Sequence, residues 1–205
     1  YREGKRSIYE GGHRVPFIVR WPAGIVSPGR IYSLPVCQTD LLATLAELVG
    51  VSLPNDAGED SQSFLPALTK TATVNRVPII HHSSRGEFAI RDKQWKLVMG
   101  SAKKRTQELY DLSNDPGETH NLFETQSERA KKLEQKLTHI IRSGRSTQGD
   151  PVLNDTPYWN DLFWMTEEEY RQTDLAMNTI EKKTKIHRLA STRRSVFDAF
   201  VYINR

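Results

Sequence analysis

The sequence contains very little cysteine and no long apolar run, and both absences narrow what the chain can be. A single cysteine, Cys37, excludes a disulfide within the chain. No stretch of about 18 apolar residues occurs, so no membrane-spanning helix is predicted. The first residues also lack the basic and apolar segments of a secretion signal. With 37% hydrophobic and 26% charged residues in 205, the composition is that of an ordinary globular chain of one or two domains.

The charge of the chain is moderately positive, with a formal net charge of +4 and a pI of about 9.2. Such a balance can favour anionic partners. The basic residues gather partly near the end, where a solvated helix face is the preferred interpretation. They include Lys182, Lys183, Lys185, Arg188, Arg193 and Arg194.

Residues 4–22 form the most informative stretch of the sequence. Lys5 stands in a short loop that leads to Glu10-Gly11-Gly12. Paired glycines let a backbone approach another group closely. An apolar run follows between two prolines, which predicts a buried strand over 16–21. The pattern therefore places a lysine on a loop directly before a core strand, where functional residues concentrate.

A helix is predicted over residues 36–49. Thr39 or Gln38 can begin it, and Gly50 ends it. Its apolar residues recur with a helical period of about 3.6 residues and form one face. They are Leu41, Leu42, Leu45, Leu48 and Val49. Cys37, at the start of this segment, is interpreted as a small packed residue rather than a nucleophile.

The middle of the chain predicts a small antiparallel sheet covered by one helix. Strands are predicted over 77–82, 87–91, 94–99 and 108–112, with Asp92-Lys93 as a tight turn. A helix is predicted over 128–141, with Ser127 as its N-cap and Gly144 as its stop. Its inward face consists of Ala130, Leu133, Leu137, Ile140 and Ile141. Together these elements form an α+β unit.

The end of the chain differs in character. Four aromatic residues cluster at 158–164, which indicates a segment that docks on the domain. Thr166 precedes three glutamates, so a helix is predicted from there to about Leu189.

The motifs at these positions resemble those of the sulfatases, which belong to the alkaline-phosphatase-like superfamily. The lysine loop is similar to that of bacterial arylsulfatases, and the resemblance covers residues 1 to about 155. Its further motifs follow in the family's order. They are Cys37–Leu45, Leu53-Pro54, Glu59–Ser61, His81–Ser83, Phe88–Arg91, Trp95–Leu97, Glu108–Leu112, Asp115–Thr119, Asn121-Leu122 and Gly144–Thr147.

The resemblance implies an α/β fold class: the end of an alkaline-phosphatase-like sulfatase domain plus a small C-terminal four-stranded antiparallel sheet with a covering helix. Residues 1–76 would complete the catalytic domain. Residues 77–155 would form the C-terminal subdomain. Residues 156–205 lie beyond the resemblance, and their composition predicts an aromatic and basic extension that we expect to be helical.

The resemblance also implies an enzyme, a sulfuric ester hydrolase that acts on aryl or carbohydrate sulfates. In the family a formylglycine attacks the sulfur while a calcium ion holds the sulfate. The nucleophile motif and the metal-binding Asp-Asn pair are missing here and are expected before Tyr1, as the remaining N-terminal part of the same protein. The chain alone is therefore expected to be inactive. Lys5 matches the family's catalytic lysine, and no metal ligand is assigned.

Four further residues are assigned expected roles. His82 is expected to contact the alcohol portion of the substrate, and His13 is a second substrate-binding candidate. A structural role remains open for each histidine. Glu10 and Arg14 are expected to form a charge pair that holds the loop. No zinc spacing and no phosphate-binding glycine loop is present.

Other functions remain open at this point. The longer protein could be a phosphodiesterase or phosphonate hydrolase of the same superfamily, because fold does not fix function. The chain could instead be a basic, non-enzymatic module that binds polyanions. A sulfated small molecule or carbohydrate is the expected partner, with no nucleic acid. The resemblance favours a periplasmic or secreted location.

Overall fold

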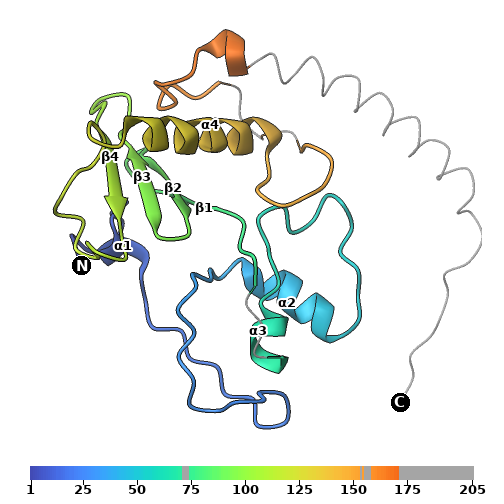
Figure 1. The fold of residues 1–205 in the computed structure, drawn as a ribbon. Coiled ribbons are helices and arrows are strands. Elements are labelled where there is room, and N and C mark those ends of the chain that lie inside the picture. The colour runs from blue at the N-terminus through green and yellow to red at the C-terminus, as the bar shows by residue number, and fades with distance from the viewer. Residues whose placement is uncertain (71–73, 153, 155–157, 171–205) are drawn as a thin grey trace, which may run out of the picture.

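The computed structural model describes residues 1–70, 74–152, 154 and 158–170 of the chain. A four-stranded antiparallel sheet lies at its centre, with strands in the order β1-β2-β3-β4 (Figure 1). The strands are β1 (Ile79–His82), β2 (Phe88–Asp92), β3 (Trp95–Met99) and β4 (Gln107–Asp111). The predicted sheet is thus confirmed, and its strand ends shift by one or two residues.

The turn between β2 and β3 lies one residue later than predicted. Asp92 pairs with Trp95, so Lys93 and Gln94 form the two-residue turn. Lys93 adopts a positive φ of 58°, as a tight hairpin turn of this kind requires.

Helix α4 (Ser127–Ser143) covers one face of the sheet. Its Leu133 and Leu137 are buried against strand residues of that face, as the helical spacing predicted. Gly144 ends the helix with a left-handed φ of 64°, which confirms the predicted stop. The predicted N-cap is wrong by one position: Gln126 occupies it and makes no side-chain capping bond.

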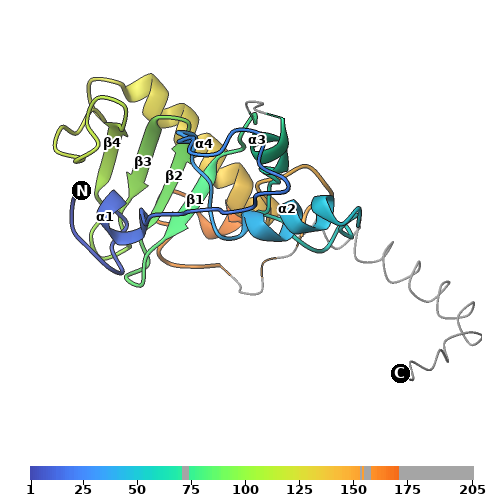
Figure 2. The ribbon, with the colours of Figure 1, turned by 90° about the horizontal axis from the view of Figure 1, so that it is seen from below.

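The N-terminal residues cover the opposite face of the sheet. Ile8 and Tyr9 pack there against Ala89, Val98 and Tyr110, directly before the short helix α1 (Glu10–His13). Figures 1 and 2 show α1 and α4 on opposite sides of the strands. Because successive strand side chains point to opposite faces, one strand serves both layers.

The strand predicted over 16–21 does not form in the chain by itself. Residues 16–21 belong to no helix or strand, and no strand within the described part of the chain pairs with them. Ile18 is 89% exposed. A strand needs a neighbour that satisfies its backbone N–H and C=O groups, and local sequence cannot supply one.

The helix predicted over 36–49 is shorter in the structure, where α2 spans Asp40–Leu48 and packs beside α3 (Leu65–Thr69). Gly50 follows with a positive φ of 71°, which agrees with the predicted stop. The helical apolar stripe exists, but its leucines are exposed, whereas Asp40 and Thr44 are buried. The predicted apolar face is thus present, and it is exposed in the chain by itself.

The aromatic segment docks on the domain as predicted. The core formed by the sheet and α4 also includes Leu162, Met165 and Tyr170. Tyr158, Phe163 and Trp164 are partly buried and pack against the same core. Thr166 and Glu169 exchange backbone and side-chain hydrogen bonds, a capping box that begins a helix. Residues 171–205, with the expected remainder of this helix and the basic cluster, lie outside the described residues.

The core beneath α4 allows a stability test. Leu137 is fully buried, so Leu137→Ala should lower the free energy of unfolding by about 2–5 kcal/mol. Leu48→Ala, on the exposed face of α2, is the matched control and should change it by less than about 0.5 kcal/mol. Urea unfolding of both variants measures the difference. Equal losses would mean that the two leucines are equally buried.

Candidate active-site loop and its buried charge cluster

The lysine loop, residues 3–7, folds back on helix α1. Ser7 N donates to the Gly4 carbonyl at 3.1 Å, and Gly11 N donates to the Arg2 carbonyl at 3.0 Å. A Cβ on Gly11 would lie 2.2 Å from the Glu3 carbonyl oxygen, and one on Gly12 would lie 2.1 Å from that of Ser7. The paired glycines are therefore needed for the loop to pass this closely, as predicted.

Lys5 lies in the turn of this loop with its side chain exposed. The next residue, Arg6, has a positive φ of 76°, so the turn is tight at this point. An ammonium held on a short, folded-back loop is available to an anion that approaches from outside.

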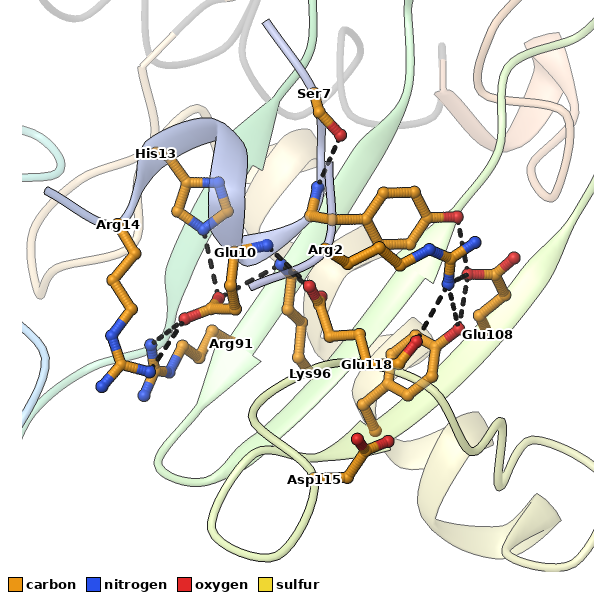
Figure 3. Close-up of polar contacts among 12 residues, drawn as sticks. Arg2, Ser7, Glu10, His13, Arg14, Arg91, Lys96, Glu108, Asp115 and Glu118 are labelled. Carbon is orange, nitrogen blue, oxygen red and sulfur yellow. Dashed lines mark hydrogen bonds and ion pairs between the residues drawn. The ribbon is translucent and has the colours of Figure 1, made fainter. Parts of the chain in front are cut away.

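Glu10 lies beneath the loop and is fully buried. Its carboxylate is surrounded by basic side chains (Figure 3). Lys96 Nζ lies 3.2 Å from Oε1 and Arg91 Nη1 lies 3.1 Å from Oε2. Arg14 Nη1 also lies 3.6 Å from Oε2, which confirms the predicted pair, and His13 Nε2 lies 3.2 Å from Oε1.

A second buried carboxylate completes the cluster. Glu118 accepts a 2.6 Å hydrogen bond from Glu10 N, and its Oε1 lies 2.8 Å from Lys96 Nζ. Lys96 is itself fully buried, so it bridges two carboxylates away from water. Figure 3 shows this arrangement between α1 and the sheet. We call Glu10, His13, Arg14, Arg91, Lys96 and Glu118 the Glu10 cluster.

The sheet register explains why these residues meet. Arg91 pairs with Lys96, and Lys96 pairs with Tyr110, so all three lie in one row across the sheet. This row is on the face that α1 covers. The motifs around residues 96 and 118 were recognised in the sequence without a role. The signal that could have indicated a buried partner is Lys96 itself, a lysine on the strand face that the packed apolar residues Ala89 and Val98 share.

A second polar group anchors the chain before the loop. Arg2 Nη1 donates to Tyr110 Oη at 2.8 Å and to the Glu118 carbonyl at 3.1 Å. Tyr9 and Tyr110 both donate to Glu108 Oε2, at 2.7 and 2.8 Å. Hydrogen bonds to a charged partner are about twice as strong as neutral ones. The lysine loop is thus fixed at both of its ends.

The pKa of Glu10 lies below its usual value. Burial by itself would raise it, but the His13 hydrogen bond and the charges of Lys96 and Arg91 outweigh burial and lower it. The carboxylate is therefore ionised in the folded chain over the whole physiological range.

This lowered pKa predicts acid sensitivity. Stability from Glu10 is fully present above its unfolded pKa of 4.5 and is lost as the pH falls toward the folded value. The free energy of unfolding should therefore decline as the pH falls below about 4.5. This group contributes a slope of up to about 1.4 kcal/mol per pH unit. Urea titrations across this range should show a shallower slope for Glu10→Gln. Glu3→Gln, an exposed glutamate of the same loop, should leave the slope unchanged.

The structure places the two candidate histidines on opposite faces of β1. His13 stacks on His81, with ring centroids 4.0 Å apart, on the face of α1. His82 stacks on Phe88 at 4.3 Å, on the face of α4. Burial and the neighbouring His13 lower the pKa of His81, so it is neutral. His13 therefore shares the Glu10 cluster with the lysine loop, whereas His82 belongs to a different surface.

The described residues contain no group of three or more His, Cys, Asp or Glu side chains that could hold a metal ion. Cys37 is partly buried, and Arg76 Nη2 donates to its Sγ at 3.2 Å. Burial raises the pKa of this thiol. The described residues thus do not provide the carboxylate ligands of a calcium site. No helix among the described residues is both long and apolar enough to cross a membrane.

Fold and site together define a sheet-and-helix unit that fixes a lysine loop over a buried charge cluster, and comparisons with known proteins assign that unit to the sulfatases. The model of the family described as "N-sulphoglucosamine sulphohydrolase, C-terminal" matches residues 3–145. The chain belongs to this family, which confirms the resemblance and the fold class.

Several sulfatases are similar in sequence or structure. An N-acetylgalactosamine-6-O-sulfatase of Bacteroides thetaiotaomicron is 37% identical over 153 residues, which cover 68% of this chain and 30% of that protein. Human arylsulfatase A is 36% identical over 147 residues, covering 60% of this chain and 28% of the enzyme. A solved structure, described under metabolism of multiple glycosaminoglycans by the same Bacteroides, is 35% identical with a TM-score of 0.59, covering 68% of this chain and 32% of its own. The chain thus spans about a third of the length of these relatives.

Proposed function

We propose that this chain is the C-terminal part of a sulfatase that hydrolyses sulfate esters, and that Lys5 binds the sulfate group. The observation that carries the proposal is the lysine loop held by the Glu10 cluster in a chain of this family. Holding a catalytic group within a fraction of an ångström requires support by locked neighbours. The buried ion pairs around Glu10 are such a support.

The chemistry proposed for Lys5 is electrostatic. A sulfate ester gains negative charge on its leaving oxygen as the S–O bond breaks. An ammonium that is already in place stabilises this charge more in the transition state than in the ground state. The formylglycine nucleophile and the calcium site are expected from other segments of the longer protein.

The exposed apolar residues support a partner within the same protein. Phe17, Ile18 and the leucines of α2 form apolar surface that a monomeric chain would normally bury. We propose that the remaining α/β domain covers them, with residues 17–19 as one strand of its sheet. Because Lys5 lies shortly before residues 17–19 in the chain, a strand at 17–19 in that domain would hold Lys5 beside the reaction centre.

We propose a sulfated carbohydrate or aryl sulfate as the substrate, with His82 near its alcohol portion. The pKa of His82 is lowered by burial, in spite of the nearby Asp161, so the ring is neutral near pH 7 and both donates and accepts hydrogen bonds. His13 remains a second substrate-binding candidate. Its contacts with Glu10 and His81 favour a role in positioning the loop.

The function is tested by comparing the chain with the longer protein. The 205-residue chain should show no turnover of an aryl sulfate above the blank with calcium supplied, because it has no nucleophile motif. The longer protein should hydrolyse sulfate esters. Turnover by the chain alone would contradict the proposed division of the machinery. A longer protein that cleaved phosphodiesters and no sulfate ester would contradict the proposed reaction.

A further inference from the structure

An open groove lies where β1 ends, on the side of the sheet away from the Glu10 cluster. It has a volume of about 720 Å³. The β1–β2 loop forms one wall, and the segment after β3 and the aromatic segment form the others. Its lining residues are His82, Ser83, Ser84, Arg85, Gly86, Ser101, Lys103, Trp159 and Asp161.

Trp159 presents an aromatic ring to this groove. It meets the ring of His82 edge-to-face at 4.6 Å and that of Phe88 at 5.4 Å. Its Nε1 donates to Asp161 Oδ2 at 3.2 Å. These contacts fix the indole, yet the residue remains 37% exposed. A fixed and partly exposed indole suits an amphipathic ligand, because its ring is apolar and rigid.

Asp161 is built into the groove. Its Oδ1 accepts a 2.9 Å hydrogen bond from Ala102 N, and its Oδ2 accepts the indole bond. A Cβ on Gly86 would lie 2.2 Å from Oδ2, and Gly86 has a positive φ of 81°, so glycine is required there. The carboxylate thus serves to hold the groove together. The family match ends at residue 145, so Trp159 and Asp161 come from a segment beyond it.

The groove also offers exposed positive charge. Arg85 and Lys103 line it, and both are exposed. Arg85 lies 4.0 Å from Glu3 with both side chains largely in solvent, and such a pair is weak enough to open for a ligand. Glu3 belongs to the lysine loop, so the groove adjoins that loop at this edge.

We propose that this groove binds an anionic sugar unit of the substrate, with Trp159 stacking on the sugar ring and Arg85 and Lys103 binding its sulfate or carboxylate group. The proposal rests on the proposed function and adds a substrate class: an oligosaccharide that is charged at more than the hydrolysed position. Among the lining residues, Arg85 and Lys103 are positively charged, and Asp161 is a carboxylate that accepts hydrogen bonds from Ala102 N and Trp159 Nε1. The lining therefore carries a net positive charge, which favours an anionic ligand over a neutral one.

Binding by the 205-residue chain tests this groove without catalysis. Isothermal titration calorimetry should detect hexasaccharides of chondroitin sulfate or heparin, and their desulfated counterparts should bind more weakly. Trp159→Ala should weaken binding roughly tenfold. Lys103→Ala should weaken it about threefold and reduce its salt dependence. Lys132→Ala, an exposed lysine on α4, is the matched control and should bind as the unaltered chain does.

The outcomes separate the two proposals. Circular dichroism confirms folding of each variant, and Lys103→Ala, in an exposed turn, tests the groove even if Trp159→Ala unfolds. No binding of either sulfated hexasaccharide, equal binding of the desulfated forms, or unchanged binding by the Lys103 variant would overturn the groove proposal. A longer protein that binds these sugars through the groove but hydrolyses no sulfate ester would overturn the proposed function alone.

Discussion

Replacing Lys5 with alanine in the longer sulfatase should lower kcat by about 10²–10³ while leaving the fold intact. The loop carries an exposed lysine on a backbone that is fixed by Gly11, Gly12 and the Glu10 cluster. Loss of the ammonium would remove a charge that acts mainly in the transition state, so kcat should fall more than KM rises. Steady-state kinetics on two or more sulfate esters, together with thermal unfolding, measure both effects.

Two comparisons make this result specific. Lys132→Ala removes an equally exposed lysine far along the chain and should leave kcat unchanged. His82→Ala should affect some sulfate esters more than others, because we propose that it meets the alcohol portion. Near-normal turnover of Lys5→Ala on several esters would show that Lys5 is not catalytic. A loss of thermal stability that matched the loss of rate would assign it a structural role instead.

Lys96→Ala should cause the largest loss of stability in the chain, about 3–5 kcal/mol. Lys96 is fully buried and bridges Glu10 and Glu118, at 3.2 and 2.8 Å. Its removal leaves two buried carboxylates with less compensation, and an uncompensated buried charge costs much more than a lost surface pair. Urea unfolding at neutral pH measures the change.

The matched control is Lys136→Ala. Lys136 pairs with Asp92 at the surface, and its side chain is 54% exposed, so its loss should cost less than about 1 kcal/mol. A combined Lys96→Met, Glu10→Gln and Glu118→Gln variant should recover part of the stability, because the charges are then removed together. Equal costs for Lys96→Ala and Lys136→Ala would show that the cluster contributes no more than a surface pair.

These two predictions link the stability of the subdomain to the proposed chemistry. The Glu10 cluster joins α1 to strands β2 and β3 and to the turn that carries Glu118. A change that weakens the cluster without touching Lys5 should therefore affect catalysis through the position of the loop. The C-terminal sheet, in this proposal, is the support on which the sulfate-binding loop rests.

The sequence predicted the sheet, its covering helix and the glycine-dependent loop correctly. Each of these depends on local patterns: alternating strands around a two-residue turn, the leucine spacing of α4 with Gly144 at its end, and paired glycines before Arg14. Such patterns act over a few residues, so the chain alone determines them. The pair of Glu10 and Arg14 was predicted from the loop motif, whereas the short helix α1, which spaces the two residues one turn apart, was not predicted.

Only the tertiary structure decided how charge and apolar surface are distributed. Lys96 and Glu118 reach Glu10 from about a hundred positions away, and only the packing of α1 against strand β3 and the turn after β4 brings them together. His81 and His82 alternate between the two faces of β1, but only the packing of α1 places His13 against His81 and so on the face away from His82. The apolar stripe of α2 and the run at 17–19 were recognised, but their burial depends on what packs against them. Spacing along a chain determines which face is apolar, whereas burial is a property of the whole assembly of elements.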